Sequence, residues 1–451
     1  MHCKMVQRAE KMSLRVIYED NHLLVVEKPA NIPVQADSSG DMDLLTLAKG
    51  YVKEKYNKPG EVYLGLVHRL DRPVSGVIVF ARTSKAAARL TESFKKRLTK
   101  KCYAAIVAGE AEYNAEYEDW LLKNEQTNTS AIVQESTPGA KRAKLEAVKV
   151  AAKDGYSLVD ILLHSGRHHQ IRVQLSGHGI PIYGDQRYNR AAKPGQQIAL
   201  HAYSLTIEHP TLKTQMTVTC TPSGGAFDAF KEEVNALCWG IRCSYIDKNV
   251  ICVNKQAGLA CTIEDEGESA VEASLTHAFN RRVYPVHRLD VMTSGLVLFA
   301  RNERTERILS DAIKKHSIKK TYLAEVFGCP NPAVQRLVLF GKKNAAEAKM
   351  TVFDRKVAGS VEMITDCRVI ERRGDRSLIE IGLVTGRTHQ IRASLAHIGC
   401  PLVGDDKYGD RTLNKKERNG LHLTAVRIEF PDDVSELLQL KCKVIETGAA
   451  F

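Results

Sequence analysis

Hydrophobic and polar positions along the chain predict strands and helices in the same order twice. Two β-rich runs, LLVVEKPANIPV (residues 23–34) and VICVNKQAGLAC (residues 250–261), each end in a lysine and a turn segment, which is typical of a strand that leads into a loop. Further β-rich runs follow at residues 74–82 and 293–301. After each of them, SKAAARLTESFKKRL and ERTERILSDAIKKH space their apolar residues along one face of a helix.

The rest of each half continues this parallel. YAAIVAG and YLAEVFG are typical of strands and are followed by a long β-rich middle segment. Near the end of each half, LLHSGRHHQIRVQLSGHG and LVTGRTHQIRASLAHIG predict a strand that runs into a helix. Because strands outnumber helices in this order, we predict an α+β fold with a mixed, largely antiparallel sheet.

The same parallel holds at the level of single residues. VHRLDRPVSGVIVFAR (residues 67–82) reappears as VHRLDVMTSGLVLFAR (residues 286–301), and matched residues along both halves keep an offset of 219 to 221. A period of this length indicates two complete domains rather than a solenoid. TPSGGA (residues 221–226) interrupts the periodicity, and a helix-like segment follows. We therefore predict a tandem duplication with modules at residues 1–238 and 239–451.

Composition narrows the class of protein. With 451 residues, 43% hydrophobic and 26% charged, the chain suits two globular domains. No apolar run reaches the roughly 18 residues that a membrane span needs, and the first residues lack a secretory signal, so we expect a cytoplasmic protein. Eleven irregularly spaced cysteines predict reduced thiols and no metal site. The net charge of +12 favours a polyanionic partner without identifying it.

One acid lies at the centre of each repeated motif. Asp71 and Asp290 follow a short apolar run and precede a turn-like segment that carries Ser75-Gly76 or Ser294-Gly295, so we place them on loops at a strand edge, where catalytic groups often lie. A turn aspartate that caps backbone amides would fit a single occurrence. The recurrence of the whole motif favours catalysis, because Ser, Thr or Asn caps equally well.

An arginine in the second motif could hold this acid. If HHQIR and THQIR are helical, His169 and Arg172, like His389 and Arg392, lie one turn apart on one face. A buried arginine needs an acid, and pairing with the aspartate would hold that acid in its ionised form. A purely structural Arg–Asp clamp stays open as an alternative, and both roles can coexist.

An aromatic residue follows a basic cluster in each half. Tyr103 and Tyr322 come after a predicted helix that ends in lysines and arginine or histidine. Lysines at a helix C-terminus complement its dipole, but beside an aromatic ring they also suit RNA, with ammonium groups on phosphates and the ring on an unpaired base. The segments GDQRY (residues 184–188) and GDDKY (residues 404–408) are interpreted as turns that shape the site wall, without chemistry.

Taken in order, these motifs carry a specific resemblance. HRLD followed by SG and FAR, then K-x-Y, GR-x-HQIR, GD-x-x-Y and LHA or LHL, resembles the RluA-type pseudouridine synthases, and both halves match along nearly their whole length. The resemblance implies an α+β catalytic fold around a sheet with a cleft, no metal or organic cofactor, and a uridine in structured RNA, ribosomal or transfer, as substrate. It makes Asp71 and Asp290 the essential aspartates.

The resemblance also implies roles for the other motif residues. Tyr103 and Tyr322 would lie against a uridine flipped out of its helix, where the phenol could also help to remove the C5 proton, and Arg172 and Arg392 would pair with the aspartates. The residues that we expect to bind substrate come from the same motifs in both modules: His68, Arg69, Lys100, Lys101, Arg167 and His169, and His287, Arg288, Lys319, Lys320, Arg387 and His389. Many relatives carry an N-terminal RNA-binding domain of the S4 type, which we do not expect here. We also expect a monomer, with no DNA or membrane partner.

Three alternatives stay open at this stage. The chain could be a non-catalytic RNA-binding protein, one module could be catalytic while the other only binds RNA, or the aspartate could direct water at the glycosidic bond as in a nucleoside hydrolase. The sequence also leaves open whether the aspartate acts as a nucleophile or as a base.

Overall fold

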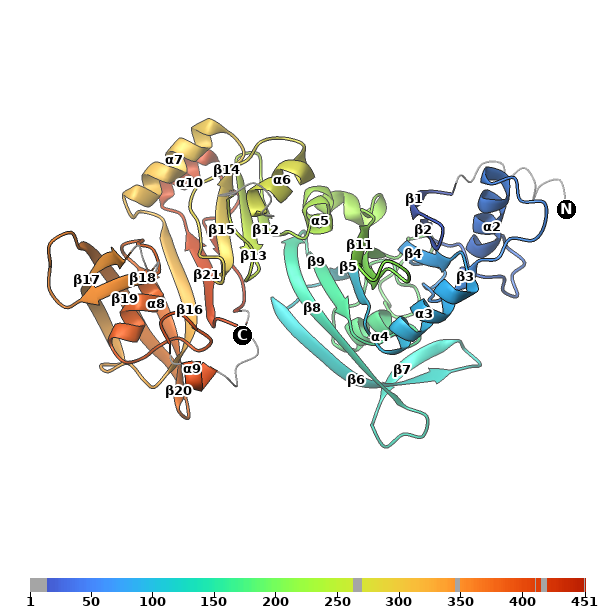
Figure 1. Cartoon of the computed structure of the whole chain (residues 1–451), viewed down its shortest axis with the longest axis horizontal. Helices are drawn as coiled ribbons and strands as arrows, with labels where there is room; N and C mark the ends of the chain where they lie inside the picture. Colours follow the sequence, from blue (N-terminus) through green and yellow to red (C-terminus); the bar gives the residue numbers. More distant parts are fainter. Residues whose placement is uncertain (1–13, 263–269, 345–348, 410, 415–419, 450) are drawn as a thin grey trace. The chain divides into compact units, whose positions relative to one another are not determined.

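The computed structural model describes residues 14–262, 270–344, 349–409, 411–414, 420–449 and 451. The chain divides into two compact units, Met1–Cys238 and Trp239–Phe451 (Figure 1). Each unit is built on one 11-stranded sheet with helices beside it, so the predicted α+β class is confirmed. No helix in the described parts of the chain is long and apolar enough to cross a membrane.

The first unit contains the strands and helices from β1 to α5. Its strands are β1 Val16–Glu19, β2 Leu23–Lys28, β3 Gly65–Leu66, β4 Ser75–Ala81, β5 Lys100–Ala108, β6 Asn114–Asn124, β7 Thr129–Val133, β8 Lys141–Lys153, β9 Tyr156–Leu163, β10 Leu200–Glu208 and β11 Gln215–Thr219. Its helices are α2 Leu44–Lys55, α3 Ser84–Lys95, α4 Gln170–Gly177, the short 3-10 helix η1 Gly225–Phe230 and α5 Lys231–Cys238.

The second unit contains the strands and helices from β12 to β22. Its strands are β12 Arg242–Ile246, β13 Val250–Lys255, β14 Tyr284–Pro285, β15 Ser294–Ala300, β16 Lys319–Phe327, β17 Val334–Asn344, β18 Lys349–Phe353, β19 Val361–Arg373, β20 Arg376–Leu383, β21 Leu423–Glu429 and β22 Val444–Glu446. Its helices are α6 Val271–Phe279, α7 Glu303–Lys314, α8 Gln390–His397, α9 Arg411–Asn414 and α10 Asp432–Leu438.

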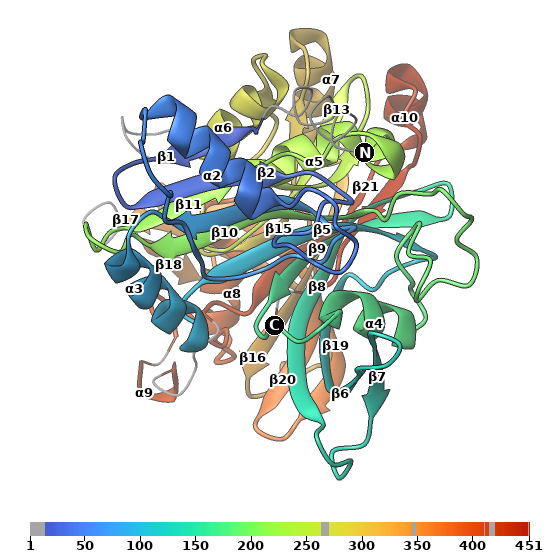
Figure 2. The same cartoon turned by 90° about the vertical axis from the view of Figure 1, so that its right-hand side faces the viewer.

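The two sheets have the same strand order. The first runs β1-β2-β4-β10-β5-β9-β8-β6-β7 and the second runs β12-β13-β15-β21-β16-β20-β19-β17-β18. Within the described residues, β4 with β10 and β15 with β21 are the parallel pairs, and the other strand neighbours are antiparallel. Figure 2 shows β5, β9 and β8 of the first sheet side by side. The predicted mixed, largely antiparallel sheet is therefore present in each unit.

The parallel pair explains the Ser-Gly of the repeated motif. Ser75 and Gly76 pair with His201 and Ala202 at the start of β10. Gly76 has a φ of 128°, and a Cβ at this position would lie 2.3 Å from the carbonyl oxygen of Ala202. Because only glycine tolerates both conditions, this dipeptide lets β4 and β10 approach each other directly behind the Asp71 loop. Gly295 repeats the arrangement against Ala425.

The helix after β4 forms for local reasons. The Thr83 side chain accepts a hydrogen bond from the backbone N–H of Ala86 and caps α3, as Ser and Thr commonly do. The apolar face of α3 buries Leu90 against β2 and β4, and Asn302 and Leu309 play the same parts in α7. These two helices confirm the sequence prediction, whereas α2 and α6 were not predicted.

Candidate active sites

The repeated aspartates lie on loops that lead into β4 and β15. The backbone N–H of Val74 donates to the carbonyl oxygen of Asp71 at 3.0 Å and closes a turn, and Thr293 makes the same bond to Asp290. Each carboxylate side chain is 29% exposed. Each acid is therefore held by a fixed loop and is open to a ligand, as predicted for a group at a strand edge.

The buried Arg172 links Asp71 to a second acid. Its Nη1 lies 3.3 Å from Oδ2 of Asp71, whereas its Nε and Nη2 donate to the two carboxylate oxygens of Asp185 at 2.8 and 2.7 Å. The predicted pairing with Asp71 is therefore present, but the fork of the guanidinium is held by Asp185, which is 1% exposed. Such a bidentate bond fixes both position and orientation of the arginine.

The second unit repeats this arrangement. Arg392 donates to both oxygens of Asp405 at 2.8 Å, and its Nη1 lies 3.6 Å from Oδ2 of Asp290. The interpretation of residues 184–188 and 404–408 as turns without chemistry is thus incomplete. Asp185 and Asp405 in these segments hold the arginine that faces the partly exposed aspartate. The occurrence of both GD-x-x-Y and GR-x-HQIR in each half could have predicted this contact.

The histidine before α4 is not on the helix. His169 has a φ of 52° and precedes Gln170, the first residue of α4, so the expected helical face shared with Arg172 is wrong. Its Nε2 nevertheless lies 3.7 Å from Oδ2 of Asp71, and its Nδ1 lies 2.9 Å from the hydroxyl of Tyr188. Burial lowers the pKa of His169 to about 4, against the opposing charge of Asp71, so the ring is neutral at pH 7. His389 and Tyr408 make the same contact at 2.9 Å.

The tyrosine of the K-x-Y motif lines the apolar side of the site. Tyr103 is 8% exposed and packs in one cluster with Leu70, Val74 and Ile171. Burial raises the pKa of Tyr103, and the charge of Asp71 raises it further. Burial and the charge of Asp290 act in the same way on Tyr322. Both phenols are therefore neutral at pH 7 and present a ring, rather than a ready base, beside the carboxylate.

The other predicted substrate-binding residues fall into two groups. His68 and His287 accept hydrogen bonds from the backbone N–H of Val79 and Leu298 at 3.1 and 3.2 Å, so their rings join the motif loop to its strand. The remaining ones lie on the surface or partly on it, around the sites: Arg69, Lys100, Lys101 and Arg167, and Arg288, Lys319, Lys320 and Arg387. These two sets form a basic rim in each unit.

A buried lysine under each aspartate loop was not predicted as part of the site. Lys28, at the end of β2, is 0% exposed, and its Nζ donates to the carbonyl oxygens of Pro29, Arg72 and Val74 at 2.7 to 2.9 Å. Burial lowers the pKa of Lys28 to about 7, and the charge of Asp71 opposes this effect. The sequence feature that could have predicted this role is the lysine at the end of the first β-rich run of each half.

The second unit holds its loop with the equivalent lysine. Lys255, 1% exposed, donates from Nζ to the carbonyl oxygens of Gln256, Leu259 and Val291 at 2.9 to 3.0 Å. Burial lowers the pKa of Lys255 to about 8, with the charges of Cys261 and Asp290 acting against it. In both units one ammonium group therefore ties the loop after the exposed acid to the end of the neighbouring strand.

We expect Lys28→Met to destabilise the first unit through its Asp71 loop. Methionine fills a similar volume but leaves three buried carbonyl groups without their donor, which should lower the free energy of unfolding by about 2 to 4 kcal/mol. Urea denaturation of the full chain measures this decrease. Lys53→Met, on the exposed side of α2, is the control. An unfolding free energy equal to that of the control would show that Lys28 does not hold the loop.

Each unit thus brings together a partly exposed carboxylate, a buried arginine fixed by a second acid, and a buried phenol. Among the described residues, no three His, Cys, Asp or Glu side chains converge as metal ligands would. The carboxylate is suited to attack on, or proton transfer from, a ligand that rests on the tyrosine ring.

The family model described as RNA pseudouridylate synthase matches residues 22–177 and again residues 249–397, which include both aspartates and both arginines. The chain therefore belongs to the RNA pseudouridylate synthase family, a class of isomerases that act on uridine in RNA, and the predicted resemblance is confirmed.

Individual relatives match about half of the chain. An uncharacterised RNA pseudouridine synthase of Bacillus subtilis, YhcT, is 33% identical over 200 residues, which are 44% of this chain and 65% of that protein. One from Zymomonas mobilis is 34% identical over 203 residues, 44% of this chain and 88% of that protein. The ribosomal large subunit pseudouridine synthase C of Haemophilus ducreyi is 30% identical and covers 48% of this chain and 67% of its own length.

Among solved structures, human RNA pseudouridylate synthase domain containing 4 is similar to this chain at 21% identity. That match has a TM-score of 0.41 and covers 49% of this chain and 94% of the human protein.

Proposed function

We propose that each unit isomerises a uridine of structured RNA to pseudouridine, with Asp71 and Asp290 as the essential carboxylates. The observation that carries this proposal is the recurrence, in both units, of a partly exposed aspartate 3.3 to 3.6 Å from a buried arginine. A protein that only binds RNA needs basic surface but no such acid. Retention of the complete arrangement in both units also favours two active modules over one.

The reaction fits the groups present. The N1–C1′ bond of uridine breaks, the uracil turns, and a C5–C1′ bond forms, while C5 loses a proton and N1 gains one, so no redox partner or water is consumed. Asp71 acts on the sugar or the base either as a nucleophile or as a base. The uridine must leave its stack, at a cost of a few kcal/mol, and the Tyr103 ring provides a surface that offsets part of this cost.

Release of the C5 proton tests the proposal directly. The full chain is incubated with RNA that carries tritium at C5 of uridine, first a transcript of large-subunit ribosomal RNA and then transfer RNA, and tritium in water is measured. The large subunit comes first because relatives are named for it. We expect release with no change in RNA mass. Free uracil would indicate a hydrolase, and no release from either RNA would leave an RNA-binding protein.

We further propose that the chain acts as a cytoplasmic monomer on RNA and not on DNA. Each unit contains its own aspartate, arginine and tyrosine, so neither site needs a residue from a partner chain. The bacterial relatives named for ribosomal RNA support an RNA substrate in the cytoplasm.

The tyrosine ring can be tested apart from its hydroxyl group. We expect Tyr103→Leu to lower kcat/KM at the uridine modified by the first unit by roughly 10- to 100-fold, because stacking of a base on an aromatic ring is worth about 1 to 3 kcal/mol. Tyr103→Phe keeps the ring and should retain most of the activity. If the phenylalanine variant were as slow as the leucine variant, the hydroxyl group itself would be required, as in removal of the C5 proton.

A further inference from the structure

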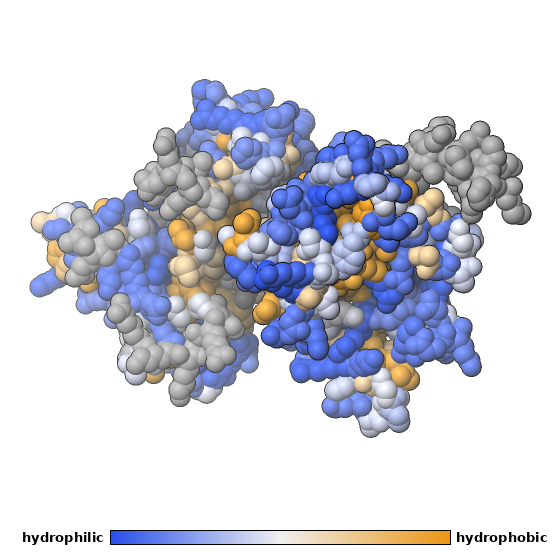
Figure 3. All heavy atoms as spheres, turned by 45° about the vertical axis from the view of Figure 1, so that its right-hand side comes forward, coloured by the Kyte–Doolittle hydropathy of each residue, from blue (hydrophilic) through white to orange (hydrophobic). Residues whose placement is uncertain are grey.

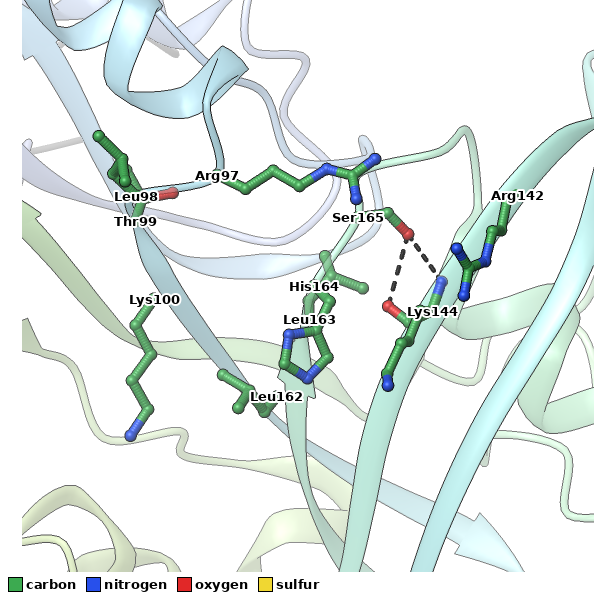
Figure 4. A pocket seen from close by; sticks show the side chains of 10 residues that line it. All are labelled: Arg97, Leu98, Thr99, Lys100, Arg142, Lys144, Leu162, Leu163, His164 and Ser165. Carbon is green, nitrogen blue, oxygen red and sulfur yellow. Dashed lines mark hydrogen bonds between the residues drawn. The ribbon is translucent and has the colours of Figure 1, made fainter. Parts of the chain in front are cut away.

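A basic cavity of about 590 Å³ opens in the first unit at the ends of β5, β8 and β9 (Figure 4). Figure 4 shows the Arg97 side chain extending toward Ser165, with Lys144 on β8 and His164 directly after β9 in the cavity wall. Leu98, on the rim, is 64% exposed. On the face drawn in Figure 3, hydrophilic residues cover much of the described surface, with hydrophobic residues between them.

The charge of the cavity is not balanced from within. Its lining contains Arg97, Lys100, Arg142 and Lys144 and no acid. Arg142 and Lys144 pair with glutamates on the neighbouring strand β6, at 2.6 and 2.7 Å. Arg97 and Lys100, by contrast, make no ion pair with any residue that the structure describes. The cavity therefore keeps a surplus of positive charge that faces solvent and suits an anion.

The wall of this cavity is joined by hydrogen bonds to the helix that carries Arg172. The Ser165 hydroxyl donates to Oε1 of Gln170 at 2.8 Å, and Nε2 of Gln170 donates to the carbonyl oxygen of Lys144 at 3.1 Å. Two residues after Gln170, Arg172 reaches Asp71. Gln170 and Arg172 both belong to α4, so hydrogen bonds from this one helix reach the cavity wall through Gln170 and Asp71 through Arg172.

The second unit has the same backbone there but not the same charge. Gln390 donates to the carbonyl oxygen of Ile364, and Gln170 makes the same bond to Lys144, so Ile364 occupies the position of Lys144. Arg387 donates to the carbonyl oxygen of Glu362, and Arg167 makes the same bond to Arg142. The acid Glu362 therefore occupies the position of Arg142. His316 stands where the first unit has Arg97, and each of the two has a positive φ, of 56° and 58°.

The equivalent of Lys100 is also less available. Lys319 lies 3.5 Å from a carboxylate oxygen of Glu429. Beside Ile364, the outer face of β17 exposes Val338, which pairs with Ile364 across the strands and is 46% exposed. At these equivalent positions the first unit therefore presents cations, whereas the second unit presents an acid and apolar side chains.

We propose that the cavity of the first unit binds backbone phosphates of the RNA strand next to the uridine held at Asp71, and that the second unit has no equivalent phosphate subsite. This inference rests on the proposed function for the identity of the strand. It follows that the two modules bind RNA through different contacts. The RNA affinity of the first module should decrease more steeply with salt concentration, because each bound phosphate releases counterions.

The test uses the full chain and measures binding without chemistry. The affinity for a short, fluorescently labelled oligouridylate RNA is measured across a range of salt concentrations by anisotropy. The cavity variant is Arg97→Asn with Lys100→Gln, because these two cations carry the unbalanced charge and asparagine tolerates the positive φ at position 97. The control, Lys53→Gln with Lys85→Gln, removes the same charge from exposed positions of α2 and α3. Matched changes in the second unit are His316→Asn with Lys319→Gln.

We expect the cavity variant to lower the slope of log affinity against log salt by about 0.7 for each phosphate that the cavity no longer binds, whereas the control and second-unit variants keep the original slope. Should the cavity variant not fold, as judged by circular dichroism, Lys100→Gln replaces it. Equal slopes for the cavity and control variants would overturn the proposal. Oligouridylate bound with the expected slopes, but without tritium release from any RNA, would leave the cavity standing and refute the proposed function.

Discussion

Asp71→Asn should abolish pseudouridine formation at one set of uridines, and Asp290→Asn should abolish it at another. Asparagine keeps the size of the side chain and its contact with the arginine but cannot act as a nucleophile or as a base. We expect kcat/KM at the affected uridines to fall by roughly 10³-fold or more, which corresponds to a decrease of about 4 kcal/mol in transition-state stabilisation. Mapping of pseudouridines in RNA from cells that carry each variant measures the effect.

The control for this experiment is Asp154→Asn. Asp154 is exposed in the turn between β8 and β9 and has a φ of 52°, which asparagine also adopts. Its pseudouridine map should equal that of the unchanged chain. A map that stays complete in either the Asp71 or the Asp290 variant would show that this unit only binds RNA.

Asp185→Ala should have the largest effect on stability. The change leaves the guanidinium of Arg172, whose side chain is 4% exposed, without its bidentate partner, and removal of one member of a buried ion pair costs about 3 to 5 kcal/mol. We expect faster hydrogen exchange in α4 and loss of modification by the first unit, because Arg172 is no longer aimed at Asp71. Exchange of peptides that cover residues 170–177 and 390–397 measures the local effect.

The second unit offers the matched variant for this prediction. Asp405→Ala should speed exchange in residues 390–397 and spare residues 170–177, since its partner is Arg392. Unchanged exchange of the helix in the mutated unit would mean that the acid does not hold the arginine in place.

Local features of the sequence determined much of this protein. The β-rich run at residues 23–28 and the helical spacing at residues 84–95 depend on neighbours along the chain, so they predicted β2 and α3 correctly. The offset between the halves required two similar domains, and the recurring HRLD and QIR motifs indicated the facing acid and arginine. These features could be predicted because they depend on residues close together in the sequence or because the sequence contains them twice.

Only the tertiary structure decided which groups meet. Arg172 lies 13 residues from Asp185 and 101 residues from Asp71, and no local pattern shows that the nearer acid takes the fork of the guanidinium. Lys28 reaches carbonyl groups 44 and 46 residues away, because β2 and β4 are neighbours in the sheet. The basic cavity of the first unit likewise forms because the starts of β5 and β8 meet the end of β9. Strand order is set by long-range pairing and packing, whose free energy is distributed over the whole unit, and the sequence carries no local record of it.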